Sequence, residues 1–215
     1  MIVVVGNPVL VAAEPRPQAG GLAVGIATAA ATTSGDVQLV GKTGDDPAGE
    51  AVLLDLAARG VGHVAMLRDP SRPTPVWPDP DAVAAAFDEA SDDEPPSAAL
   101  QDAPVLEAAD LELALRYLPD YRVLVIADPL PAAAIDVAVA AAGWSGAALI
   151  VLVPSGTTPP DLSGEATIME APTSDPDDAF AAVVGAYAAA LDRGEEPAEA
   201  FATASSGGGW SAVSD

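Results

Sequence analysis

The sequence contains no cysteine and only one histidine, His63, among its 215 residues. The missing cysteines exclude disulfides, thiolate–zinc sites and thiol catalysis. A single histidine excludes a multi-histidine metal site and most histidine-based catalytic triads. No uncharged stretch reaches the 18 or more apolar residues of a membrane span, and the opening residues MIVVVG lack the basic segment that begins a signal peptide. We therefore expect a cytoplasmic protein that does not enter membranes.

Basic residues are also scarce, since 8 Lys and Arg stand against 32 Asp and Glu, for a formal net charge of −24. Such a charge repels nucleic acid and anionic membranes, so neither is expected as a partner. A disordered acidic chain would contain few apolar residues, whereas half of this sequence is hydrophobic. The composition indicates a halophile's cytosolic protein, because molar salt shortens the Debye length to about 3 Å and screens the self-repulsion.

Strand-like and helix-like segments alternate along the chain. This alternation predicts one three-layer α/β domain over residues 1–215, with a mainly parallel sheet and helices on both faces. The expected strands are 1–6, 36–44, 63–67, 121–128, 147–156 and an edge strand at 165–170, and the expected helices are 22–35, 46–60, 109–118, 131–143, 178–194 and 196–205.

The helix at 46–60 has the clearest signals. Asp46 is a favourable N-cap residue, and Gly60 is a favourable stop. Leu53, Leu54 and Leu56 are expected to form its buried face. In contrast, the Pro-, Asp- and Ala-rich residues 76–104 contain no basic residue and predict an acidic surface excursion with one short helix at 81–90.

Two segments carry specific motifs. The first, from Gly20 to Thr74, contains a Gly-Gly pair, then GDDPAG at 44–49, ARGV at 58–61 and RPT at 72–74. The second, PTSDPDDAF at 172–180, is followed by two helical stretches. Together they resemble the two signatures of the ribokinase (PfkB) family of carbohydrate kinases. The chain looks like a divergent and shortened member, and its shortness implies a reduced lid over the sheet.

This resemblance implies phosphoryl transfer from a nucleoside triphosphate, with metal ions bridging its phosphates, to a sugar or nucleoside hydroxyl. It places Asp178 as the general base, and Gly20 and Gly21 in the substrate site. Residues 175–177 match the Gly-Ala-Gly backbone that forms the family's anion hole. ATP and Mg²⁺ are therefore the implied cofactors if the chain is an active kinase.

The same alignment shows where the chain departs from the family pattern. Asp175, Pro176 and Asp177 replace the glycine loop, and Pro176 has no N–H to donate. Two unit charges 4 Å apart cost about 4 kcal/mol at an effective dielectric near 20, so the added carboxylates oppose a triphosphate. Val11 and Gly25 stand at positions where the family has sugar-gripping Asp and Asn, and no Asn-x-x-Glu metal motif occurs between 100 and 170.

Each of these residues also has a reading without ligand chemistry. Asp178 suits a helix N-cap or first turn. Gly20 and Gly21 suit a turn that lets strand and helix approach closely. The carboxylate clusters at 91–94 and 175–178 lack the glycine and spacing of a calcium loop and are better explained as hydrated surface charge, so no metal site is assigned.

Two functional hypotheses follow. The first is a degenerate, non-catalytic sugar kinase homologue that binds a small molecule or a protein partner. The second is an active ATP-dependent carbohydrate or nucleoside kinase that uses Asp178. The sequence leaves the ligand and the oligomeric state open, and a homo-oligomer is compatible with either hypothesis.

Overall fold

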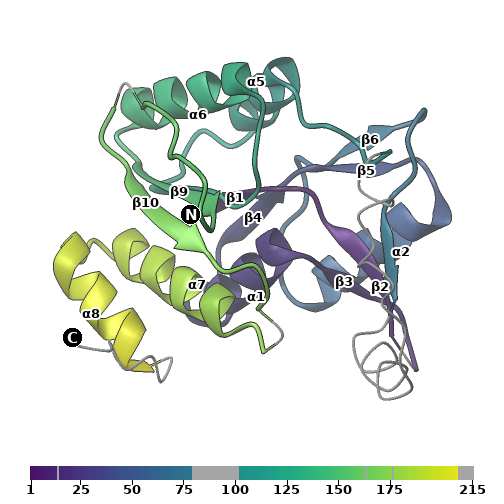
Figure 1. Ribbon diagram of the computed structural model, residues 1–215, viewed down its shortest axis with the longest axis horizontal. Coiled ribbons are helices and arrows are strands. Elements are labelled where there is room, and N and C mark those ends of the chain that lie inside the picture. The colour runs from purple at the N-terminus through teal and green to yellow at the C-terminus, as the bar shows by residue number, and fades with distance from the viewer. Residues whose placement is uncertain (14, 79–101, 163, 176, 208–215) are drawn as a thin grey trace.

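The computed structural model describes residues 1–13, 15–78, 102–162, 164–175 and 177–207. Five parallel strands form the central sheet in the order β10-β9-β8-β1-β4 (Figure 1). The strands are β1 (Ile2–Val5), β4 (Val37–Val40), β8 (Val123–Ile126), β9 (Ala148–Pro154) and β10 (Thr167–Ala171). The predicted edge strand is β10, which lies at one end of this order.

Helices cover both faces of the sheet, which confirms the predicted three-layer α/β fold. One face packs against α1 (Leu22–Ser34), α7 (Ala179–Asp192) and α8 (Pro197–Gly207), and the other against α5 (Ala108–Arg116) and α6 (Ala132–Ser145). Alternate residues of β1 belong to opposite cores: Ile2 and Val4 contact the first layer, and Val3 and Val5 the second. The unbroken apolar runs IVVV and VLVI are buried for this reason.

A smaller sheet stands beside the main one, where the resemblance places the lid. Its order is β3-β2-β7, from β2 (Val9–Ala12), β3 (Gln18–Gly20) and β7 (Val76–Pro78). Residues 76–78, at the start of the predicted surface excursion, pair in parallel with β2. The helix predicted at 81–90 lies outside the described residues.

Two predicted strands differ from those observed. The segment 36–44 divides at Gly41 into β4 and β5 (Lys42–Gly44), because β4 pairs with β1 in the main sheet whereas β5 belongs to a separate two-stranded sheet. A Cβ at Gly41 would collide with the Gly6 carbonyl oxygen, so this close approach requires glycine. The strand predicted at 63–67 begins later, as β6 (Leu67–Asp69), since the amide of Met66 bonds the carbonyl of His63 in a turn. β5 and β6 form a two-stranded parallel sheet.

The spacing GDDPAG…RPT has a structural cause at the start of α2 (Pro47–Ala58). Asp46 caps this helix by accepting from the Gly49 amide at 2.8 Å, as predicted. The same carboxylate accepts from the amide and the hydroxyl of Thr74, both at 2.8 Å, and the Thr74 hydroxyl accepts from the Gly44 amide at 2.9 Å. Leu54 was wrongly assigned to the buried face, because 74% of it is exposed.

The helices α1 and α7 cross at very short range. A Cβ on Gly185 would lie 2.7 Å from the Cβ of Ala29 and 2.8 Å from the amide nitrogen of Ala30. A Cβ on Gly25 would lie 3.0 Å from the Cβ of Ala181. This packing of small residues brings the N-terminus of α7 directly onto α1.

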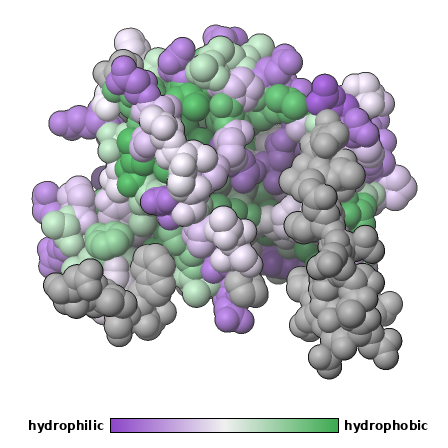
Figure 2. Space-filling model, in the orientation of Figure 1, coloured by the Kyte–Doolittle hydropathy of each residue, from purple (hydrophilic) through white to green (hydrophobic). Residues whose placement is uncertain are grey.

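On the face shown in Figure 2, hydrophilic residues lie mainly around the outline and hydrophobic residues show nearer the middle. Every helix in the described ranges is too short or too polar to cross a bilayer.

Candidate functional site

The strand order identifies one crevice at the sheet's carboxyl edge. After β1, the chain adds β4 on one side of β1 and then adds β8, β9 and β10 on the other side. The direction in which strands are added therefore reverses between β1 and β8. In open parallel sheets, ligands bind outside the carboxyl ends of the strands at such a switch point. The residues that follow β1 and β8 here are Gly6, Asn7, Ala127 and Asp128.

Asn7 and Asp128 are joined across this switch point. The Asn7 amide donates a hydrogen bond to Asp128 Oδ2 at 2.8 Å. Burial raises the pKa of Asp128 to about 6, and the hydrogen bond from Asn7 acts in the opposite direction. In the described part of the chain no cation lies within ion-pair distance of this carboxylate. Asp128 is therefore a partly buried carboxyl without a counterion among the described residues.

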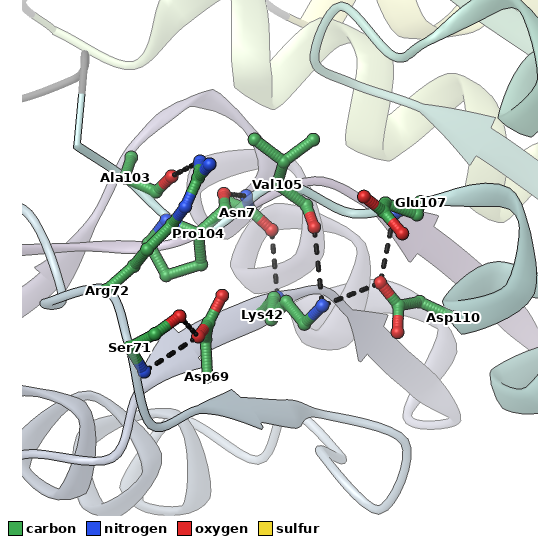
Figure 3. A network of polar contacts seen from close by, with 10 residues as sticks. All are labelled: Asn7, Lys42, Asp69, Ser71, Arg72, Ala103, Pro104, Val105, Glu107 and Asp110. Atoms are coloured by element: carbon green, nitrogen blue, oxygen red, sulfur yellow. Dashed lines mark hydrogen bonds and ion pairs between the residues drawn. The ribbon is translucent and has the colours of Figure 1, made fainter.

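The Asn7 side chain joins three further segments. Its Oδ1 accepts from the Lys42 amide at 2.8 Å, and its Nδ2 donates to the carbonyl of Pro104 at 2.6 Å (Figure 3). Asn7 thus ties the end of β1 to β5 and to the chain that enters α5.

The residues 103–105, called the strap below, are bonded through three successive carbonyls. The Ala103 carbonyl accepts from Arg72 at 2.9 Å, and the Val105 carbonyl accepts from Lys42 Nζ at 3.4 Å (Figure 3). The Pro104 carbonyl, between them, accepts from Asn7. Lys42 Nζ also pairs with Asp110 at 2.7 Å. The strap is therefore fixed by side chains that follow β1, β4 and β6.

The loop before α7 has a carboxylate at the helix N-terminus. Asp175 accepts hydrogen bonds from the amides of Phe180 and Ala181, both at 2.9 Å. Its own carbonyl accepts from the Asp178 amide at 3.1 Å. First-turn amides are the groups that bind phosphate when a loop of this kind holds a nucleotide. In this chain an internal anion accepts from two of them.

Asp178 occupies the N-cap position of α7, yet its side chain forms no capping hydrogen bond. Its backbone is left-handed, with φ 51°, which a non-glycine residue rarely adopts. The side chain faces α1, since a Cβ on Gly25 would lie 3.3 Å from Asp178 Oδ1. Desolvation and the negative charges of Asp175 and Asp177 raise the pKa of Asp178, against the opposing effect of Arg59.

Of the other two predicted anion-hole residues, only Asp177 lies in the part of the chain that the structure describes. Asp177 is exposed at the turn before α7. Pro176 lies outside the described residues. The sequence did not indicate the capping role of Asp175, because a carboxylate in a loop can face either solvent or the helix.

Gly20 and Gly21 both have structural reasons to be glycine. Gly20 pairs with Val9 in the small sheet, and a Cβ there would lie 2.5 Å from Val11 Cγ2. Gly21 precedes α1 with φ 97°. A Cβ on Gly21 would lie 3.6 Å from the Asn7 carbonyl oxygen, so the paired glycines border the switch-point crevice.

The sequence reasoning missed Asn7 and Asp128. Each lies within two residues of the end of a buried strand, in the segments VVVGN and VIAD. Polar residues at the carboxyl ends of parallel strands meet at one edge, and this signal could have found them. Among the described residues, no group of three His, Cys, Asp or Glu side chains is arranged to hold a metal ion. The cluster at 91–94 is outside the described residues.

Residues 3–77 match the model of the pfkB family carbohydrate kinases. No curated protein sequence matches the chain. Among solved structures, Sa239 superposes with a TM-score of 0.69 at 14% identity, covering 99% of this chain and 95% of that one. A PfkB protein from Polaromonas sp. JS666 superposes with a TM-score of 0.65 at 14% sequence identity, covering 96% of this chain and 94% of that one. Fructokinase from Xylella fastidiosa superposes with a TM-score of 0.60 at 17% sequence identity, covering 94% of this chain and 86% of that one.

At these identities the likeness establishes the fold alone. The chain thus has the ribokinase-like α/β fold of the PfkB kinases, and its N-terminal residues 3–77 carry that family's sequence pattern.

Proposed function

We propose that this chain is a degenerate PfkB-family sugar kinase homologue, a single ribokinase-like domain over residues 1–215, that acts by binding and no longer transfers phosphoryl groups. The observation that carries the proposal is the Asp175 carboxylate, which accepts from the amides of Phe180 and Ala181 at the N-terminus of α7.

Phosphoryl transfer depends on positioning and on neutralising the charge of the moving group. The N-terminus of a helix contributes roughly half a positive charge, together with its free N–H groups. Asp175 brings a full negative charge to that position and takes two of the donors. A triphosphate would have to displace this carboxylate and then meet Asp177 and Asp178 beside it.

The switch-point crevice supports the same proposal. The strap residues 103–105 are bonded to Asn7, Lys42 and Arg72, which follow three different strands. A ligand that entered between β1 and β8 from this side would compete with those hydrogen bonds. The ligand of the homologue is then a small molecule held elsewhere in the cleft, or a protein partner, with a homo-oligomer as one form of the latter.

The alternative is an active carbohydrate or nucleoside kinase. It is favoured by one observation: the Asp178 side chain is not used for capping and has a raised pKa, as a general base requires. ATP and Mg²⁺ would be its cofactors. A solved structure of the fructokinase from Xylella fastidiosa has bound ATP; it superposes with a TM-score of 0.53 at 18% identity, covering 94% of this chain and 64% of that one.

A titration with Mg-ATP separates the two. The protein is held in KCl while its melting temperature is followed, and ADP release is measured with a panel of sugars and nucleosides. The binding proposal expects no melting shift at millimolar nucleotide and no ADP release. Sugar-dependent ADP release that disappears in Asp178→Asn would establish the kinase instead.

The charge of −24 leads us to propose further that the protein works in the cytosol of a halophile. At molar salt the repulsion among its carboxylates is screened within about 3 Å.

A further inference from the structure

A concave site that includes Asp128 lies apart from the start of α7. A pocket of about 170 Å³ opens between the ends of β8 and β9 and the first turns of α6. Its volume is close to that of an apolar cavity of roughly 150 Å³ that holds benzene. The residues that matter for its chemistry are Ile126, Asp128, Ile135, Val151, Val153 and Thr158.

The pocket belongs to the α6 side of the sheet. Ile126, Val151 and Val153 are members of the core that α5 and α6 cover, whereas Phe180 and Ala181 at the start of α7 belong to the opposite core. The sheet therefore separates most of the pocket lining from Asp175 and Asp178. A ligand in this pocket does not need the α7 loop.

The charge of the pocket comes from one residue. Among the residues that the structure describes, Asp128 is the one ionisable side chain in the lining, and neither Lys nor Arg contributes to it. The carboxylate has one hydrogen bond, from the Asn7 amide, and no ion pair in the described ranges. An unpaired carboxylate among apolar side chains favours a positive partner.

The N-terminus of α6 acts against this preference, since it begins after Pro131 without an acidic residue in its first turn. A helix N-terminus contributes roughly +0.5 of a charge, however, and the carboxylate contributes a full −1. The net electrostatic potential in the pocket is therefore negative, in a molecule whose total charge is already −24.

The far wall of the pocket is well supported. Glu170 on β10 accepts from the Gly156 amide at 2.6 Å and from the Ser155 hydroxyl at 2.8 Å. The Thr157 hydroxyl donates to the Pro154 carbonyl at 2.6 Å. These bonds fix the turn after β9, and the exposed Thr158 next to it belongs to the pocket lining.

We propose that this pocket binds a compact organic cation, a primary ammonium on a short apolar body, with the Asp128 carboxylate as counterion and the Thr158 hydroxyl as a second polar contact. The aliphatic walls take the apolar body. The inference goes beyond the proposed loss of phosphoryl transfer and does not depend on it.

The test uses three probes of one shape: cyclopentylammonium, cyclopentanol and cyclopentanecarboxylate. Each is titrated into the ¹⁵N-labelled full chain at constant KCl, and amide shifts are followed by NMR. We expect saturable shifts for residues 126–135 and 151–158 with the ammonium alone. Asp128→Asn, which keeps an acceptor for the Asn7 amide, should weaken binding roughly ten- to a hundredfold, as for a lost charged hydrogen bond.

Asp136→Asn is the matched control, because it makes the same charge change at an exposed position of α6 and should leave binding unchanged. Ile135→Trp fills the pocket without touching the charge and should abolish the shifts. The proposal is overturned if the alcohol or the carboxylate binds as well as the ammonium, or if Asp128→Asn and Asp136→Asn behave alike. Because the shift map of the unmodified chain is itself decisive, a variant that fails to fold leaves the test intact.

Discussion

Replacing Asp175 by alanine tests the arrangement on which the proposed function depends. The variant loses the carboxylate that accepts from the Phe180 and Ala181 amides, both at 2.9 Å. Loss of a capping side chain costs about 1 kcal/mol, with a range of roughly 0.5–2 kcal/mol. Loss of a negative charge near a helix N-terminus costs about 0.3–1 kcal/mol more.

One effect opposes this loss. The charge of Asp175 helps to raise the pKa of Asp178, so its removal relieves a repulsion in the folded state. We therefore expect a net loss of about 1–2 kcal/mol in the free energy of unfolding. For a domain of this size each kcal/mol corresponds to roughly 2–4 °C in melting temperature. Asp175→Asn, which keeps one acceptor oxygen, should lose about half as much.

The assay is thermal unfolding beside urea unfolding, with Asp120→Ala as the control because Asp120 is exposed in the turn before β8. A second measurement adds inorganic phosphate to both variants. Without the carboxylate, the N-terminus of α7 should attract phosphate, so the stability of Asp175→Ala should rise more with phosphate than that of the control. If Asp175→Ala and Asp120→Ala have the same melting temperature and the same response to phosphate, Asp175 does not occupy an anion site.

Three further outcomes follow from the structure. Because the pKa of Asp128 is raised from 3.8 to about 6, the folded state holds its proton more tightly and loses stability as pH rises from about 4 to 6. Asp128→Asn should remove this pH dependence and be more stable at pH 7, by at most about 3 kcal/mol, since one pKa unit is about 1.4 kcal/mol. Urea midpoints across this pH range measure the effect. An unchanged pH dependence in the variant would contradict the raised pKa of Asp128. Gly185→Ala should lose about 1–3 kcal/mol by overpacking against Ala29, whereas Gly143→Ala, with open space around it, should be neutral or stabilising in the same melts. The melting temperature should rise between 0.1 and about 2 M KCl by more than in sucrose of equal osmolality, because salt screens the charge of −24; equal effects would contradict the halophile proposal.

Much of the fold could be read from local patterns. The strand IVVV, the Asp46 cap of α2 and the stop of α1 at Gly35 each depend on residues close together in the sequence. Hydrophobic period and capping chemistry act over one or two turns, so they predict where elements begin and end. The errors occurred where contacts between distant residues determine the structure, as in segment 36–44, where β4 pairs with β1 and β5 pairs with β6.

The candidate site depended on tertiary structure to a greater extent. The sequence showed that residues 175–177 contain no glycine and that Pro176 has no N–H to donate. It could not indicate that Asp175 turns toward the helix, because that choice depends on how α7 packs on α1.

The sequence by itself determined the composition, the alternation of strands and helices, and the absence of glycine from residues 175–177, since all three are properties of neighbouring residues. Only the tertiary structure placed Asn7 against Asp128, fixed the strap across the sheet edge and, within the described residues, left Asp128 without a counterion. Those contacts join residues about a hundred positions apart, and strand order, which no local pattern encodes, brings them together.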